Sequence, residues 1–147
     1  MKRIPTLVSI LGAVLVIGFA ATLSAEERCS LRSVAGDFGY TVTGWRLPVG
    51  PAASVGSVHF NRDGTLSGTQ TLSLNGTIVQ GEVLTGTITV NDDCTGSSVI
   101  VVSNTPFPRT TTVDVVWVND SDEFRLIFTN SGTILTADGK RLHHGND

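Results

Sequence analysis

The 147-residue sequence predicts an all-β protein, an eight-stranded antiparallel up-and-down β-barrel, on three observations. The dipeptides Asp63-Gly64 and Asn75-Gly76 separate runs in which apolar residues alternate with Thr, Ser or Gln. Such dipeptides are typical of tight hairpins, because type I′ turns need positive φ at both central residues. The run 65–74 alternates with a period of two, which gives a strand one buried and one solvated face. The other runs are short and evenly connected, and no helix of useful length is expected.

The individual elements follow from the same alternation and from the turn residues between the runs. Residues 26–35 are expected to form a short lead-in with one helical turn, ended by Gly36. Prolines cannot donate to a β-ladder, so residues 47–53 and 104–108 are expected to be loops. Asp138-Gly139 is expected to end the last strand. The expected strands are 37–45, 54–61, 65–74, 77–90, 97–103, 110–118, 123–129 and 133–137.

A closed barrel is favoured over the alternative, a β-sandwich. Consecutive strands are joined by tight turns, and closure removes the sheet edges that would otherwise invite aggregation. An eight-stranded barrel has an interior wide enough for side chains or for one small ligand.

The first 25 residues have the layout of a secretory signal peptide. Lys2 and Arg3 form a positive start, residues 7–21 are almost all apolar, and small residues precede Glu26. The apolar run is short of the roughly 20 residues that a membrane-spanning helix needs. We therefore expect a cleaved signal peptide at 1–25, one barrel domain at 26–140, a flexible polar tail at 141–147, and a secreted or periplasmic location.

The composition of the mature chain argues against several classes of partner. Removing Lys2 and Arg3 from the ten basic side chains leaves eight against thirteen acidic ones, a net charge of −5. No basic cluster remains, so neither a nucleic acid nor, after signal cleavage, a membrane is expected as a partner. No Cys/His group has metal-ligand spacing, and neither a metal nor a cofactor is expected.

The two cysteines, Cys29 and Cys94, are expected to form a disulfide. An even pair in an exported protein is more often a disulfide than a catalytic thiol or a metal site. Closing a loop of this length would stabilise the fold by roughly 4 kcal/mol in the chain-entropy model.

Several stretches resemble those of small secreted bacterial proteins with an allene-oxide-cyclase-like barrel, a superfamily that also includes the plant dirigent proteins. They are the signal peptide, a first Cys near the mature start, DGTLSGTQTLSLNG at 63–76 and GTITVNDDCTGS at 86–97. The resemblance implies an eight-stranded barrel with an apolar cavity, often trimeric. The plant enzymes cyclise an oxylipin epoxide, and dirigent proteins steer phenoxy-radical coupling. None of their active-site residues can be matched here, so the resemblance implies no catalytic residue.

Strand parity indicates which side chains line the barrel interior. Gly68 and Gly86 share the inward parity, so they are expected to leave space for a small ligand beside Tyr40 and Gln70. The alternative is that these glycines only relieve crowding where the sheet bends. The side chains expected to line the lumen are Phe38, Tyr40, Val42, Leu66, Gln70, Leu72, Leu84 and Ile88.

Glu82 is the ionisable residue of greatest interest. It shares the parity of Leu84 and Ile88, and a carboxylate facing an apolar lumen would have a raised pKa and could act as an acid, a base or a ligand anchor. The pattern favours instead a solvent-exposed position at the barrel rim. Gly81, next to Glu82, is an expected β-bulge, and a bulge there would reverse the face of Glu82.

Other candidate residues have simpler interpretations. His59 is expected on the surface rather than as a catalytic base. The pair His143-His144 lies in the polar tail, and a metal site is not expected there. Tyr40, Trp45 and Trp117 could line a pocket, although aromatic residues on strand faces usually fill the core.

Two runs, 97–102 and 113–118, are apolar on both faces. A barrel buries only one face of each strand in its lumen, so the outer face is expected to meet a partner or to be covered by the proline-rich loops. The partner would be another copy of the chain, as in the trimer that the resemblance implies.

Three functions are consistent with the sequence. The favoured one is a secreted barrel that binds a small apolar or amphipathic molecule in its lumen. The alternatives are a cyclase- or isomerase-type enzyme of the same fold, and a structural or adhesive domain with a filled core. The sequence contains no recognisable combination of catalytic residues, which favours a binding or structural role over catalysis.

Overall fold

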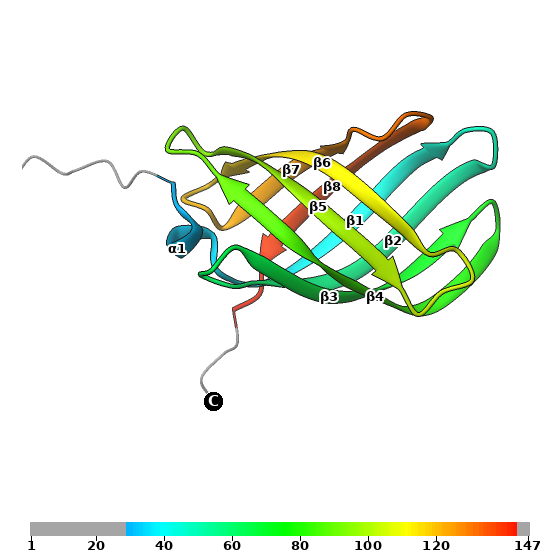
Figure 1. Cartoon of the computed structure of the whole chain (residues 1–147), viewed down its shortest axis with the longest axis horizontal. Coiled ribbons are helices and arrows are strands. Elements are labelled where there is room, and N and C mark those ends of the chain that lie inside the picture. The colour runs from blue at the N-terminus through cyan, green and yellow to red at the C-terminus, as the bar shows by residue number, and fades with distance from the viewer. Residues whose placement is uncertain (1–28, 144–147) are drawn as a thin grey trace, which may run out of the picture.

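Eight antiparallel strands close into a barrel in the computed structural model, which describes residues 29–143 (Figure 1). Each strand pairs with the next one along the chain, and the first pairs with the last. The predicted up-and-down barrel is therefore confirmed, and the sandwich alternative is wrong. The elements are α1 (Leu31–Val34), β1 (Gly36–Arg46), β2 (Gly50–Phe60), β3 (Thr65–Leu74), β4 (Thr77–Val90), β5 (Thr95–Ser103), β6 (Arg109–Val118), β7 (Glu123–Phe128) and β8 (Thr133–Arg141).

The strand bounds agree closely with expectation except in two places. β2 begins at Gly50, so the expected loop at 47–53 is shorter and Pro51 lies within the strand, opposite Trp45. Pro51 has no N–H to donate to the ladder, which is tolerated because it lies at the start of the strand. Its carbonyl oxygen still accepts a hydrogen bond from the Asn75 amide at 2.8 Å. β8 continues through Asp138 and Gly139, where a turn was expected.

The extension of β8 has a packing reason. A Cβ atom at Gly139 would lie 2.2 Å from the ring of Phe124, so the glycine lets this ring pack directly against the β8 backbone. Gly139 is thus a strand residue chosen for close approach, not a turn residue.

The end of β8 is held firmly at Arg141, which was expected in the flexible tail. Its guanidinium donates to the carbonyl oxygens of Ser33, Ala35 and Ser121 and forms a 2.7 Å ion pair with Asp122. The expected tail at 141–147 therefore begins too early. Residues 144–147, like the expected signal peptide at 1–25, lie outside the described residues.

One end of the barrel is closed by α1 and by aromatic side chains; we call it the plugged end. Helix α1 is the expected single helical turn, and Ser30 and Ser33 cap it reciprocally. The predicted disulfide joins Cys29, just before this helix, to Cys94 in the turn between β4 and β5. Inside, four rings pack at centroid distances of 5.2–6.0 Å, mostly edge to face. These rings belong to Phe38, Phe60, Trp117 and Phe124.

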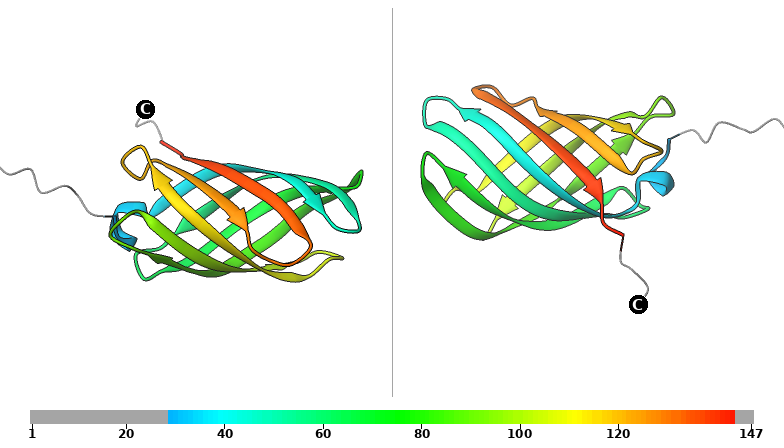
Figure 2. Two further views of the ribbon diagram at one scale, coloured as in Figure 1. Left: turned by 90° about the horizontal axis from the view of Figure 1, so that it is seen from above. Right: turned by 180° about the vertical axis from the view of Figure 1, so that it is seen from behind.

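The other end carries the four loops 47–49, 75–76, 104–108 and 129–132, and we call it the loop end. Figure 2 shows the four hairpin connections gathered at this end, opposite α1 and the last residues of β8. The two ends therefore differ in construction: packed aromatic side chains fill the plugged end, whereas only hairpin loops surround the other.

The inward-facing glycines bring neighbouring backbones together instead of opening space. A Cβ atom at Gly68 would lie 2.3 Å from the Ser57 carbonyl oxygen, and one at Gly86 would lie 2.1 Å from that of Val99. Both positions are filled by the adjacent strand. The expectation that these glycines leave room for a ligand is wrong, and the alternative, relief of crowding in a bent sheet, is the one observed.

The outer faces of β5 and β6 remain exposed in the described chain. Val99, Val101, Val116 and Val118 are all partly accessible, and loop 104–108 lies at the loop end rather than over them. Loop cover is therefore ruled out as the explanation for these apolar faces, and assembly with further copies stays a prediction. Within residues 29–143, no helix is long and apolar enough to cross a membrane.

Candidate functional site

The barrel encloses a cavity of about 190 Å³ to which all eight strands contribute lining residues. At the plugged end it is bounded by Phe60 and Phe124 of the aromatic plug. At the loop end it is lined by residues that include Arg46, Asn130 and Ser131. Seven of the eight side chains expected to line the lumen do so. They are Tyr40, Val42, Leu66, Gln70, Leu72, Leu84 and Ile88. Phe38 is the exception, because it is fully buried within the aromatic plug.

A polar row crosses the wall of this cavity from β1 to β4. The strand registers place Tyr40 opposite Gly56, Gly56 opposite Gln70, and Gln70 opposite Glu82. Gly56 matters because a Cβ atom there would lie 2.8 Å from both the Tyr40 hydroxyl and the Gln70 Cβ. The missing side chain lets Tyr40 reach across β2 and donate a 2.9 Å hydrogen bond to Gln70 Oε1.

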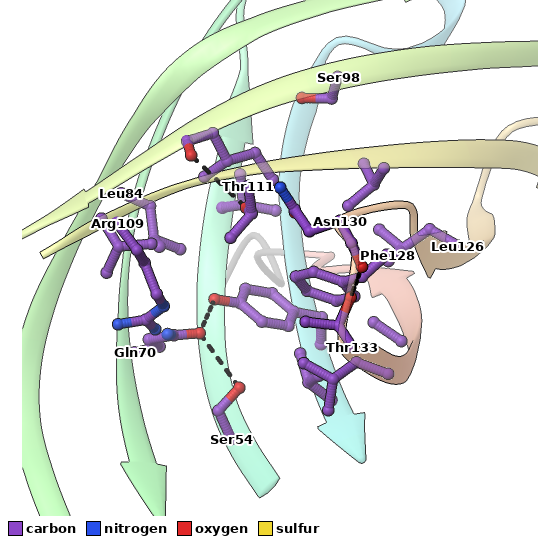
Figure 3. Close-up of a pocket in the computed structure, with 18 of the residues that line it drawn as sticks. Ser54, Gln70, Leu84, Ser98, Arg109, Thr111, Leu126, Phe128, Asn130 and Thr133 are labelled. Atoms are coloured by element: carbon purple, nitrogen blue, oxygen red, sulfur yellow. Dashed lines mark hydrogen bonds between the residues drawn. The ribbon is translucent and has the colours of Figure 1, made fainter. Parts of the chain in front are cut away.

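Gln70 is oriented by its neighbours on both sides. Its Oε1 also accepts from Ser54 Oγ at 3.1 Å, while its Nε2 donates to Glu82 Oε2 at 2.6 Å. Figure 3 shows the hydrogen bond from Ser54 to Gln70, with Gln70 beside Arg109 on one wall of the cavity. Because the ionised Glu82 carboxylate can only accept, it fixes the NH₂ end of the Gln70 amide, and the Tyr40 and Ser54 hydroxyls then donate to the oxygen end.

The β-bulge at Gly81 places Glu82 in this row. The predicted bulge is confirmed by a register shift between Gln70 and Leu72 and by the positive φ of Gly81. Residues before the bulge change face, so Val79 points inward while Ile78 is exposed. Glu82 keeps the inward parity of Leu84, and the expected rim position in water is wrong.

Glu82 is fully buried, and four hydrogen bonds satisfy both of its oxygens. Arg109 forms a two-pronged ion pair with it, donating from Nη1 to Oε1 and from Nη2 to Oε2, each at 2.8 Å. Thr105 donates to Oε1 at 2.6 Å, and Gln70 completes the set at Oε2. Parallel N–H donors on a carboxylate are among the strongest pairs in proteins.

This environment reverses the expected direction of the Glu82 pKa. Burial raises the pKa, but the hydrogen bonds from Arg109, Thr105 and Gln70 and the charge of Arg109 outweigh burial and hold it below its ordinary value. The carboxylate is therefore ionised at neutral pH, with no free lone pair directed at the lumen. Burial, and next the charge of Glu82, raise the pKa of Tyr40 above its ordinary value, so its phenol stays protonated.

The partners of Glu82 were not identified from the sequence. Arg109 is the first residue of β6, and it shares the inward parity of Val113 and Val115. That parity was the available signal, but its position directly after Pro108 suggested a loop. Arg46 was missed in the same way at the end of β1, on the parity of Tyr40 and Val42.

The remaining candidates lie outside the cavity. His59 is exposed on β2, as expected, and contacts Asp37 at 2.7 Å across the β1–β2 pair. Trp45 is exposed and Trp117 belongs to the plug, so neither lines the cavity. Among residues 29–143, no three His, Cys, Asp or Glu side chains come close enough to hold a metal ion.

Comparison with known proteins gives no match: no family model, no curated protein and no solved structure matches this chain. The similarity to allene-oxide-cyclase-like and dirigent barrels stays a prediction from the residues at 63–76 and 86–97.

Proposed function

We propose that this protein binds one small apolar or amphipathic molecule inside the barrel. The observation that carries the proposal is the cavity of about 190 Å³, which is walled mainly by aliphatic side chains and carries a smaller number of polar groups, among them the Tyr40–Gln70 row. Ligand sites in proteins are typically concave and apolar, with a few placed polar groups that fix orientation. The volume lies below the ~300–1,000 Å³ of sites for drug-sized molecules, so the ligand is a small one.

Binding is better supported than catalysis. A buried Glu82 in an open lumen would favour a cyclase or isomerase if the carboxylate could exchange a proton with a substrate. Here both oxygens are occupied by Gln70, Thr105 and Arg109, and the pKa is lowered instead of raised. Glu82 thus acts as the anchor that holds Gln70 and Arg109 in place.

The proposed site of action is outside the cytoplasm, in a secreted or periplasmic setting. The Cys29–Cys94 disulfide supports this, because such bonds persist in oxidising compartments.

The test is uptake of the neutral fluorescent probe N-phenyl-1-naphthylamine by the purified protein. Ala137 faces the lumen and Thr136 faces outward on the same strand, so Ala137→Phe and Thr136→Phe form a matched pair. We expect saturable fluorescence enhancement in the parent and in Thr136→Phe, and its loss in Ala137→Phe. No uptake by the parent, or equal uptake by both variants, would overturn binding in the lumen.

A further inference from the structure

Arg46 lies where the cavity meets the loop end, and its guanidinium has no partner among the described residues. It lines both the lumen and a surface depression at the loop end, together with Arg109, Ser131 and Thr133. It is the last residue of β1 and has the inward parity of Tyr40 and Val42, so the strand directs it toward the cavity.

Other partly buried arginines in the described chain are fully used. Arg109 is paired with Glu82, and Arg141 is bonded to Asp122 and to three carbonyl oxygens. Arg32 and Arg62 have no recorded partner, but both are exposed to water. Among the arginines of residues 29–143, Arg46 alone is partly buried without a carboxylate in ion-pair contact, and Glu82 acts on it only from beyond that distance.

The charges around Arg46 leave the loop end positive. Arg46 and Arg109 contribute two positive charges against the single carboxylate of Glu82. Burial is the main cause that lowers the pKa of Arg46; the charge of Arg109 lowers it further, and the charge of Glu82 opposes both. The four loops at this end contain no Asp or Glu.

The plugged end has the opposite character. Acidic residues occupy the turns at that end, away from the cavity opening. They are Asp63, Asp92, Asp93, Asp120 and Asp122. Basic residues also lie at the plugged end, namely Arg32, Arg62, Lys140 and Arg141, but the acidic ones outnumber them. An anion therefore meets a more favourable field at the loop end, where the cavity and Arg46 lie.

We propose that Arg46 binds the anionic head group of the ligand, so that the molecule held in the barrel is a small amphipathic anion with its apolar tail in the lumen. This inference rests on the proposed binding function and specifies its ligand class. A carboxylate suits the fork of N–H donors on a guanidinium, and a sulfate or phosphate ester offers the same acceptor chemistry.

A second donor is available at the same end. Asn130 lines the cavity, and its Oδ1 accepts a 2.9 Å hydrogen bond from the Thr112 amide. The side-chain NH₂ of Asn130 is thereby turned away from Thr112, and no described residue accepts from it. Figure 3 shows Asn130 and Thr133 on the wall opposite Arg109 and Gln70.

The experiment compares octanoate with 1-octanol, which share a chain length but differ in charge, by isothermal titration calorimetry at pH 7 and low salt. We expect the parent to bind octanoate more tightly. Arg46→Gln should weaken octanoate binding by about 10- to 100-fold, the loss typical of a hydrogen bond to a charged group, and should leave octanol within about twofold of the parent. Octyl sulfate and octyl phosphate, as further arms, identify the preferred head group.

Arg62→Gln is the matched control, since it removes the same charge from an exposed turn at the plugged end. It should bind both probes like the parent. Circular dichroism and the melting temperature establish that each variant is folded. For a readout that needs no variant, the carboxyl ¹³C signal of labelled octanoate should titrate at lower pH when bound to the parent than when free.

The outcomes separate this inference from the proposed function. If octanol binds as tightly as octanoate, or if Arg46→Gln leaves their ratio unchanged, the Arg46 site is wrong while lumen binding stands. If neither octyl probe nor the neutral naphthylamine binds to the parent, both proposals are wrong.

Discussion

Replacing Glu82 with glutamine tests whether the buried ion pair organises the cavity wall. The four side-chain groups around the carboxylate, two N–H groups of Arg109 and one donor each from Thr105 and Gln70, all donate. A carboxamide has only one acceptor oxygen. Whichever way the new amide points, an N–H group of Arg109, which can only donate, would face its NH₂ group. Arg109 would also lose its counter-charge.

The expected cost is large because neither partner can escape into water. The Glu82 side chain is fully buried and that of Arg109 is 13% exposed. Removing one partner of a buried ion pair typically costs about 3–5 kcal/mol, a large part of the ~5–15 kcal/mol that stabilises a domain. At about 4 °C per kcal/mol for a domain of this size, the melting temperature should fall by roughly 12–20 °C.

The assay is urea unfolding with the disulfide kept oxidised, at neutral and at acidic pH. Because the folded-state pKa of Glu82 is lowered, its stabilisation is present above its ordinary pKa of 4.5 and is lost as the pH falls through the folded-state value. The parent should therefore lose stability in this acidic window. Glu82→Gln should lack this part of the pH dependence.

Two further variants make the test decisive. Glu123→Gln makes the same substitution in a pair of partly exposed residues with Arg125, where about 0–1 kcal/mol is expected. The double variant Glu82→Met with Arg109→Met should be more stable than either single variant, because no buried charge is left unpaired. If Glu82→Gln costs no more than Glu123→Gln, the reasoning about the buried pair is wrong.

Two further predictions concern the barrel wall and its closure. Gly68→Ala should destabilise the protein by about 1–3 kcal/mol, since its Cβ would lie 2.3 Å from the Ser57 carbonyl oxygen. Gly39→Ala should cost less, because its Cβ would meet only the Leu142 side chain, at 3.2 Å. Equal thermal stabilities of the two variants would contradict this account. Replacing both Cys29 and Cys94 with serine should lower the free energy of unfolding, measured with urea, by about 4 kcal/mol. The reason is that the disulfide joins residues 65 apart in sequence. A loss below ~1 kcal/mol would show that the packing of α1 alone closes this end.

The strand pattern of this protein is readable from local sequence. Alternation with a period of two and the turns at 63–64 and 75–76 were enough to place β3 and β4 at their observed bounds. Both signals depend only on residues within one hairpin, so they can be interpreted without information from the rest of the chain. Strand parity likewise identified seven cavity-lining residues on β1, β3 and β4, because successive side chains of a strand alternate between the inner and outer face of a closed barrel.

Parity says which face a side chain takes but not how far along the barrel it lies or what it meets. Phe38 and Tyr40 share a face, yet one belongs to the plug and the other to the cavity. Gly68 appeared to leave space, although the backbone of β2 occupies that position. These distinctions depend on the tilt and curvature of neighbouring strands, which no single run of residues records.

The polar site was decided by tertiary structure alone. The bulge at Gly81 brings Glu82 opposite Gln70, and closure of the barrel brings Arg109 from β6 to the same carboxylate. Glu82 and Arg109 are 27 residues apart in sequence, and neither residue by itself indicates that the two form an ion pair. From the sequence Glu82 was a carboxylate with a raised pKa or a solvated rim residue. The structure makes it a buried, ionised anchor, because the charge and hydrogen bonds that surround a buried group determine its pKa, and those come from distant strands.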